Sequence, residues 1–176
     1  MLKGKSVNIR PVAERDLEEL TDRLSDPVAL GEFMPQGFIS ESNFRKNFHE
    51  HGFIRENSER YVVVSKDDEL LGSIWIFKSV TYFDSLEMGY YIFEDVSRGK
   101  GYATESVKLL TDFIFRSRQL NRLEIRMSVE NTASEKVAIN AGYTHEGVLR
   151  EAAFSNGKHH DMNTYSLLRR EWAKRW

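Results

Sequence analysis

The apolar pattern at the start of the chain predicts one strand followed by two helices. Residues 6–12 alternate apolar and polar side chains as a half-buried strand does, and residues 14–24 repeat leucine at helical spacing. Ser40 is the predicted N-cap of a second helix, whose two phenylalanines lie one turn apart. The aromatic-rich residues 30–39 between the helices fit either a buried connector or a loop that lines a substrate site.

Three consecutive strands are predicted in the middle of the chain. Residues 61–64 are rich in β-branched side chains, residues 70–80 return after an acidic turn, and residues 86–93 follow a second turn. In the third strand Glu87 and Gly89 point to the same face. Glycine inside a strand indicates a bulge or the close approach of another part of the chain.

A helix, a strand and a second helix are predicted next. Apolar residues recur at helical spacing from Ala103 to Ile114, and residues 123–129 alternate as a strand does. Asn131 opens the second helix, and Gly142 closes it at a position that favours a left-handed backbone. The pattern therefore changes from strands to alternating helices and strands.

The second of these helices carries two further signals. Thr132 and Glu135 have the spacing of a capping box. Its predicted buried stripe consists of Ala133, Val137 and Ala141. Both signals predict which face of the helix packs on the sheet.

Two strands close the chain, at residues 143–150 and 161–168, with a turn around residues 155–158. A helix between strands that lie side by side indicates a mixed α/β sheet. We therefore expect a sheet of about seven strands, flanked by about four helices, in a single domain of residues 1–176.

An anion-binding turn is predicted between the third strand and the following helix. Gly99 and Gly101 allow backbone N–H groups to approach a ligand, and the first turn of the helix favours negative charge. Arg98 and Lys100 add positive charge. The spacing matches neither a Walker loop nor the three-glycine dinucleotide fingerprint, and an ordinary strand-to-helix turn is the alternative.

The run Arg-x-x-Gly-x-Ala, at Arg98, Gly101 and Ala103, resembles the acetyl-CoA pyrophosphate loop of the GNAT superfamily of N-acetyltransferases. The sequence of this segment is most similar to that of the branch that includes the ribosomal-protein N-terminal acetyltransferases. Residues 131–143 resemble a second family segment, Asn-x-x-Ser/Ala followed by Gly-Phe/Tyr. The resemblance implies a GNAT-like α/β fold with a mixed, mostly antiparallel sheet, in which a bulge at Gly89 opens a V-shaped slot for acetyl-CoA.

The resemblance also implies where acetyl-CoA binds as the acetyl donor, with no metal. The turn and first helical residues would hold the pyrophosphate, Asn131 the pantetheine amides, and a backbone N–H of the third strand the thioester carbonyl. These residues are Arg98, Gly99, Lys100, Gly101, Tyr102, Ala103, Thr104, Asn131, Tyr91 and Ile92. For Asn131, service as a helix N-cap alone is the alternative.

Glu87 is the predicted general base. Transfer of an acetyl group to an amine requires removal of a proton from the amine, and a carboxylate on an apolar strand should have a raised pKa. Family members often place an acidic residue here, frequently acting through water. A salt-bridged or edge glutamate is the alternative. The chain has no cysteine, so direct attack in a ternary complex is expected.

Ser134 is the predicted donor to the leaving sulfur. Many GNAT enzymes use a tyrosine where this chain has Ala138, and Ser134 lies one turn earlier on the same helical face. The ribosomal branch is known for a serine here. A surface serine is the alternative, in which case water would donate the proton.

Composition narrows the class of protein and its compartment. The chain has 176 residues, a net charge of −2 and no cysteine, which fits one domain in a reducing cytoplasm and excludes disulfides. The balanced charge does not favour nucleic-acid binding, and no apolar run is long enough to predict a membrane span.

The sequence leaves three alternatives for the amine that accepts the acetyl group. A protein N-terminus is the first reading, a small amine such as a polyamine, an aminoglycoside or an aminoacyl compound is the second, and a non-catalytic CoA sensor is the third, since the usual tyrosine is missing. The C-terminal residues Leu167, Leu168, Trp172 and Trp176 would either form a homodimer interface or close the core.

Several histidines and aromatic residues have no assigned role. His49 and His51 are weak candidates for an acceptor pocket with Glu41 or Asp22, and His145 is unassigned. Adjacent residues in a strand face opposite ways, so His159 and His160 are not expected to share a metal. The aromatic residues Trp75, Tyr82 and Phe83 fit either core packing or stacking on a substrate.

Overall fold

The computed structural model describes residues 1–26, 30–34, 37, 39–93 and 99–174. The strands are β1 Leu2–Lys3, β2 Asn8–Pro11, β3 Ile54–Arg55, β4 Ser58–Val64, β5 Leu70–Phe77, β6 Ser85–Ile92, β7 Arg122–Ser128, β8 Thr144–Ser155 and β9 Lys158–Leu168. The helices are α1 Leu17–Ser25, α3 Glu41–His51, α4 Tyr102–Ser117, α5 Thr132–Ala141 and α6 Arg169–Trp172, with a 3-10 turn at Glu14–Asp16.

The strands form one mixed sheet in the order β1-β2-β4-β5-β6-β7-β9-β8, with β3 paired to β4. Every adjacent pair is antiparallel except β6 and β7. The predicted fold class is confirmed, with nine strands in place of about seven. The additional strands β1 and β3 have two residues each, which is too short for an apolar period to be visible.

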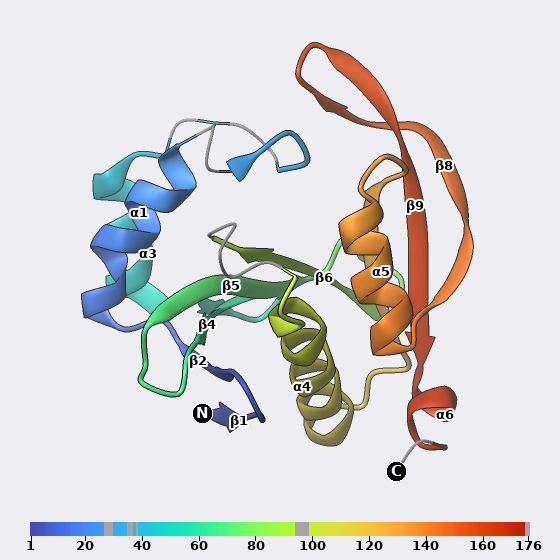
Figure 1. Cartoon of the computed structure of the whole chain (residues 1–176), viewed down its shortest axis with the longest axis horizontal. Coiled ribbons are helices and arrows are strands. Elements are labelled where there is room, and N and C mark those ends of the chain that lie inside the picture. Colours follow the sequence, from blue (N-terminus) through green and yellow to red (C-terminus); the bar gives the residue numbers. More distant parts are fainter. Residues whose placement is uncertain (27–29, 35–36, 38, 94–98, 175–176) are drawn as a thin grey trace.

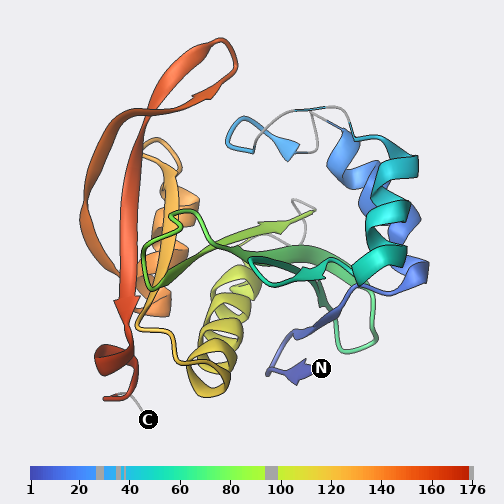
Figure 2. The ribbon, with the colours of Figure 1, turned by 180° about the vertical axis from the view of Figure 1, so that it is seen from behind.

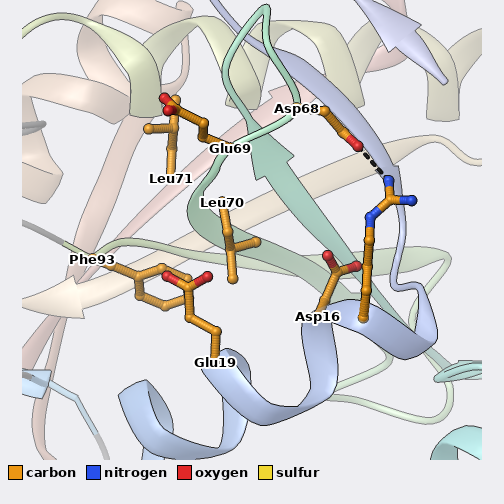
Figure 3. Close-up of a pocket in the computed structure, with 8 residues that line it drawn as sticks. Asp16, Glu19, Asp68, Glu69, Leu70, Leu71 and Phe93 are labelled. Carbon is orange, nitrogen blue, oxygen red and sulfur yellow. Dashed lines mark hydrogen bonds and ion pairs between the residues drawn. The ribbon is translucent and has the colours of Figure 1, made fainter.

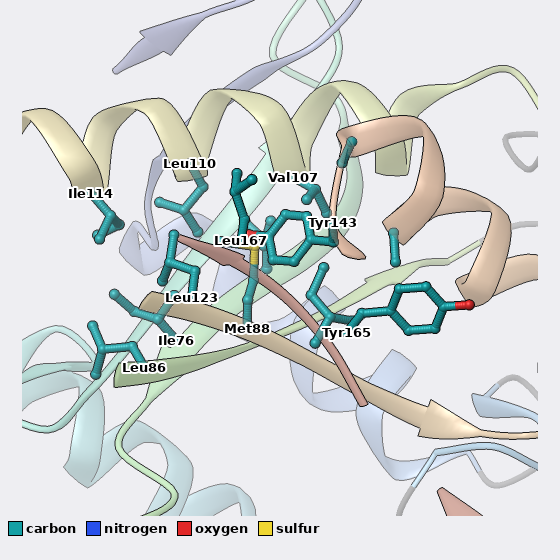
Figure 4. Packing of buried hydrophobic residues seen from close by; sticks show 14 of the residues in the cluster. Ile76, Leu86, Met88, Val107, Leu110, Ile114, Leu123, Tyr143, Tyr165 and Leu167 are labelled. Carbon is teal, nitrogen blue, oxygen red and sulfur yellow. The ribbon is translucent and has the colours of Figure 1, made fainter. Parts of the chain in front are cut away.

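The sheet lies between two groups of helices, with α1 and α3 on one face and α4 and α5 on the other (Figure 1). The core on the α4/α5 face joins aliphatic residues of α4 to β5, β6, β7 and β9 (Figure 4). A smaller core joins the predicted leucines of α1 to Val62, Val64 and Tyr91. Alternate residues of β6 therefore contribute to opposite cores, as period-2 packing requires.

The helix ends follow the predicted capping residues, with one correction. Ser40 Oγ accepts from the N–H of Asn43 at 3.4 Å, and Gly142 takes a left-handed φ of 89°. Asn131 is the N-cap of α5, because its Oδ1 accepts from the N–H of Ser134 at 3.0 Å. The capping box predicted from Thr132 is therefore wrong, since Thr132 is already the first helical residue.

The stripe predicted for α5 is also partly wrong. Ala141 is buried, and Val137 packs against the core, but Ala133 is exposed. Ala138 fills the corresponding space and is completely buried. Its lack of a larger side chain lets α5 pack closely on the sheet.

The β8–β9 hairpin extends beyond the sheet and reaches toward the residues that follow α1 (Figure 2). The turn is where the sequence predicts it, and Asn156 and Gly157 adopt φ values of 50° and 75°. At its tip the side-chain amide of Asn156 donates to the backbone carbonyl of Glu32 at 3.2 Å. One hydrogen bond thus joins the C-terminal hairpin to the N-terminal helical part.

The C-terminal strand closes the core within the described residues. Leu167 is buried among the residues of the larger core. The Trp172 ring packs on Phe115 with 5.5 Å between centroids. The core-closing alternative accounts for both residues, whereas Trp176 lies outside the described residues.

Candidate active site

The site is built where β6 and β7 separate. They pair in parallel over only three residue pairs, which end at Glu87 and Glu124. Beyond them β6 continues to Ile92 and β7 to Ser128 without pairing to each other. The separation opens the sheet next to the N-terminus of α4.

The predicted bulge at Gly89 is absent from the pairing of β6 with β5, which runs without a shift from Glu87 to Ile92. Gly89 instead lies against the indole of Trp75, since an added Cβ would come within 2.4 Å of the Trp75 ring. The alternative reading of this glycine, close approach by another group, is therefore the correct one.

Glu87 lies on the α1/α3 face of β6. One of its carboxylate oxygens is 3.3 Å from Nη1 of Arg126, and its side chain is 15% exposed. Burial raises the pKa of Glu87, while Arg126 and a hydrogen bond from Ser79 oppose the rise. The predicted direction of the pKa agrees with the structure, and the salt-bridge alternative is also realised, so Glu87 is a desolvated carboxylate held by one guanidinium.

Arg126 belongs to a row of alternating charges along β7 that sequence reasoning left unassigned. Glu124, whose side chain is 2% exposed, accepts from Arg122 Nε at 2.6 Å and from Arg126 Nη2 at 2.7 Å. Arg122 also pairs with Glu146. The alternation in the sequence placed these side chains on one face, but only the β6–β7 register brings Arg126 to Glu87.

Ser134 lies on the opposite face of the sheet, in the first turn of α5. Its Oγ is 2.8 Å from the hydroxyl of Tyr90, which also lies 3.1 Å from the Ser134 carbonyl oxygen. Burial raises the pKa of Tyr90 to about 12, so the phenol stays protonated at neutral pH. Sequence reasoning missed Tyr90, because the two residues are 44 positions apart and no local pattern links them.

The glycine turn has the predicted backbone. Gly99 and Gly101 have φ values of 74° and 82°, and the space around both is open. Gly101 is the N-cap of α4, and the half-buried residues Tyr102, Ala103 and Thr104 form its first turn. Lys100 is exposed, and Arg98 lies outside the described residues.

The first turn of α4 contains one carboxylate, and it points away from the glycines. Glu105 accepts hydrogen bonds from the backbone N–H groups of Lys5 and Ser6, the latter at 3.0 Å. Its charge is therefore used to hold the N-terminal segment. Glu105 therefore does not occupy the glycine turn, and the positive end of the α4 dipole is left to attract an anion there.

Tyr91 and Ile92 direct their backbone groups to different sides of β6. The N–H of Phe93 donates to the Leu71 carbonyl of β5 at 3.0 Å. Because alternate residues of a strand face opposite neighbours, Tyr91 also faces β5, and Ile92 faces the side where β7 separates.

The side-chain oxygen of Asn131 caps α5, which is the alternative role predicted for it.

A separate cavity of about 520 Å³ lies between α1, the β4–β5 turn and the end of β6 (Figure 3). It contains four carboxylates, but Asp16 and Asp68 are both paired with Arg10, and Asp68 also with Arg15. Phe93 marks its position after the C-terminal end of β6, whereas Glu87 is near the start of that strand. The cavity and Glu87 therefore lie near opposite ends of β6.

The histidines of the described residues have identifiable contacts. His51 Nε2 accepts from Arg55 Nε at 2.6 Å, and His49 lies 3.7 Å from Glu14. His145 hydrogen-bonds to Asn163 at 3.1 Å, and the His159 ring packs on Phe154. No group of three or more His, Asp or Glu side chains in the described part of the chain is arranged to hold a metal ion. None of the described helices is long and apolar enough to cross a membrane.

A mixed sheet that opens at one parallel strand pair, with a glycine turn and a helix N-terminus beside the opening, is the arrangement expected of a CoA-dependent acyltransferase. A family model described as an acetyltransferase (GNAT) domain matches residues 6–144. The chain therefore belongs to the GNAT acetyltransferase family, and it is an N-acetyltransferase that uses acetyl-CoA as its acetyl donor.

Individual relatives show the same relationship. The ribosomal-protein-serine acetyltransferase of Escherichia coli (strain K12) is 29% identical over 135 residues, which are 76% of this chain and 75% of that protein. The spermidine N-acetyltransferase from Vibrio cholerae, solved with CoA and spermine, is 20% identical with a TM-score of 0.83 over 95% of this chain and 98% of that chain. The structure of RimL, a ribosomal L7/L12 α-N-protein acetyltransferase in complex with coenzyme A, gives a TM-score of 0.80 at 22% identity, over 94% of this chain and 95% of that chain.

Proposed function

We propose that the acetyl acceptor is the α-amine of a protein or peptide N-terminus. The observation that carries the proposal is the pairing of Glu87, the predicted base, with a guanidinium. Glu87 is held by Arg126, and two of the four carboxylates in the separate cavity, Asp16 and Asp68, are also paired with arginines. A polyamine needs several carboxylates free to bind its ammonium groups, whereas an N-terminus brings one amine. The kinship with the ribosomal-protein-serine acetyltransferase supports the same acceptor class.

In the proposed reaction Glu87 takes a proton from the attacking amine, directly or through water. The amine nitrogen forms a bond with the thioester carbon, the C–S bond breaks, and its electron pair stays on sulfur. The hydroxyl of Ser134 donates a hydrogen bond to this thiolate, and Tyr90 orients Ser134 through the contacts of its hydroxyl with the Ser134 carbonyl oxygen and Oγ. The two groups lie on opposite faces, so the thioester would pass between them through the opening in the sheet.

The remaining cofactor contacts are part of the proposal. Residues 98–104 would hold the pyrophosphate, with the field of α4 as the favourable contribution. A backbone N–H of Tyr91 or Ile92 would bind the thioester carbonyl, and the orientation of Ile92 toward the opening supports the second choice. Asn131 would contribute its amide nitrogen to the pantetheine.

The test is acetyl-CoA-dependent CoA release with alanine- and serine-initiated peptides, spermidine and an aminoglycoside offered separately, with products confirmed by mass. Release with peptides, and acetylation at the α-amine, are the expected results. Turnover of spermidine or the aminoglycoside alone would replace the proposal with the small-amine reaction. Acetyl-CoA binding without turnover of any acceptor would favour a CoA sensor.

Location and assembly are further proposals. The cysteine-free composition fits the cytoplasm. The branch resemblance supports a homodimer, although the described C-terminal residues serve the core of the same chain. Sedimentation equilibrium of the purified protein would distinguish a monomer from a dimer.

A further inference from the structure

Arg60 is a half-buried cation on the α1/α3 face that has no carboxylate partner among the described residues. Its guanidinium donates from Nη1 to the Ser73 hydroxyl at 3.2 Å and lies 4.8 Å from the Trp75 ring centroid. A guanidinium has five N–H donors, so most of them have no acceptor in the described part of the chain. Other half-buried arginines, such as Arg118 and Arg122, pair directly with glutamates.

The Trp75 indole supplies a second donor without an acceptor. Within the described residues no hydrogen bond is formed by its Nε1, whereas Nε1 of Trp172 donates to Asp112 at 3.2 Å. Trp75 Nε1 lies over Gly89, because a Cβ added there would be 2.6 Å from it. Gly89 is thus the residue that allows this N–H to lie beside the opening of the sheet.

The register of three strands places Trp75 next to Gly89 of β6, and Arg60 one strand further on the same face as Glu87. Arg60 pairs with Trp75, and Trp75 pairs with Gly89. Glu87 is two residues from Gly89 on the same face, which is about 7 Å along a strand. An amine that reaches Glu87 from this face brings the rest of its acceptor molecule over Trp75 and toward Arg60.

The Arg60 guanidinium is partly withdrawn from water, so a ligand of opposite charge would be favoured there. Desolvation lowers the pKa of Arg60 to about 10, with no nearby carboxylate to oppose the effect. The guanidinium nevertheless keeps its proton at neutral pH. The vicinity of Trp75 and Arg60 is therefore positively charged and rich in hydrogen-bond donors, which favours a carboxylate over an ammonium group.

We propose that Arg60 and the Trp75 indole N–H form an acceptor subsite that binds a carboxylate a few bonds from the reacting amine. This inference rests on the proposed function and names its preferred substrates, N-termini whose second residue is acidic. A free amino acid carries the same chemistry in its α-carboxylate, and the kinetic assay distinguishes the two sources. A diamine or polyamine would place a second positive charge against Arg60.

The kinetic test compares two peptides that differ only at the second residue, Ala-Asp and Ala-Asn, together with free alanine. The expected result is a kcat/KM about tenfold higher for Ala-Asp, because one charge-assisted hydrogen bond contributes that much. Arg60→Gln should remove the preference without changing the KM for acetyl-CoA, and Trp75→Phe should reduce it. The exposed Arg170→Gln and the Asp112-bonded Trp172→Phe are the matched controls. Equal rates for the two peptides, or a preference that persists in Arg60→Gln, would overturn the proposal, and a preference for free alanine would assign the carboxylate to an amino acid.

A binding test does not depend on turnover. Succinate and 1,4-diaminobutane both have four carbon atoms. Succinate carries a negative charge at each end, and 1,4-diaminobutane carries a positive charge at each end. Succinate should raise the thermal midpoint of the wild-type protein and not that of Arg60→Gln, while 1,4-diaminobutane should leave both unchanged. Stabilisation by the diamine alone would reject the subsite. Absence of peptide acetylation together with the succinate effect would reject the proposed function and retain the anion subsite.

Discussion

The two faces of the sheet differ in the kind of polar group they bring to the opening between β6 and β7. On the α4/α5 face the groups are neutral, namely Tyr90 and Ser134 above an aliphatic core. On the α1/α3 face they are charged, with Glu87 paired to Arg126, and Arg60 stacked on Trp75. The difference fits a reaction in which an ionisable amine approaches from one face and an uncharged thioester arm lies toward the other.

The largest expected effect is on kcat, and it comes from a substitution on the charged face of the sheet. Glu87→Gln keeps the shape of the side chain and removes the base, so kcat should fall by about 10² to 10⁴. The affinity for acetyl-CoA should not change, because Glu87 lies on the face opposite to α4. Steady-state kinetics with isothermal titration of acetyl-CoA would measure both. Glu130→Gln, at an exposed site, is the control. An unchanged kcat would remove Glu87 from the mechanism.

A substitution on the neutral face should weaken the binding of acetyl-CoA and leave kcat nearly unchanged. Gly101→Ala forces a non-glycine residue into a left-handed backbone, which costs about 1–2 kcal/mol and misaligns the N–H groups of the turn. We expect the Kd for acetyl-CoA to rise about tenfold, with kcat at saturation nearly unchanged, as measured by titration calorimetry and kinetics. Gly157→Ala is a matched control, because Gly157 has a φ of 75° and equally open surroundings in the β8–β9 turn. Equal weakening by both variants would mean that general strain, and not the cofactor turn, is responsible.

The smallest effect sharpens the role of Arg126. The proposed base Glu87 would act in its deprotonated form, so kcat/KM should be lost as the pH falls through the pKa of Glu87. Arg126 lowers that pKa, and burial and Glu124 raise it. Arg126→Gln should therefore move the acid limb of the pH profile upward, by about one unit.

Two controls separate this electrostatic effect from a loss of structure. Arg126→Lys keeps the charge and should keep the limb near its original pH. The thermal midpoint of each variant reports on folding, since Glu124 also loses a partner in Arg126→Gln. A limb that does not move in the folded Arg126→Gln variant would contradict the pairing as the control of Glu87.

The sequence predicts the elements that have a regular period and strong end signals. The aliphatic residues of α4 and the leucines of α1 are buried as their spacing indicates. Gly142 ends α5 because only a left-handed residue fits there. The capping box predicted from Thr132 is wrong because Asn131, directly before it, is itself a good N-cap and takes that position.

The site is predicted less completely, because its contacts depend on register between distant strands. The glycine turn and Glu87 are visible in short stretches of sequence. The contacts of Tyr90 with Ser134, and of Arg126 with Glu87, require knowledge of which residues face each other across the opening. Arg60 has no local signal at all, since only the pairing of β4 with β5 places it over Trp75.

The three residue pairs between β6 and β7 are also a mechanical seam. They connect a half of the sheet that contains β1 to β6 with a half that contains β7 to β9. A substrate lying in the seam would act as part of the scaffold and stabilise the folded enzyme in proportion to the logarithm of its concentration. A higher concentration of acetyl-CoA would then raise the thermal midpoint of the protein even when no acceptor is present.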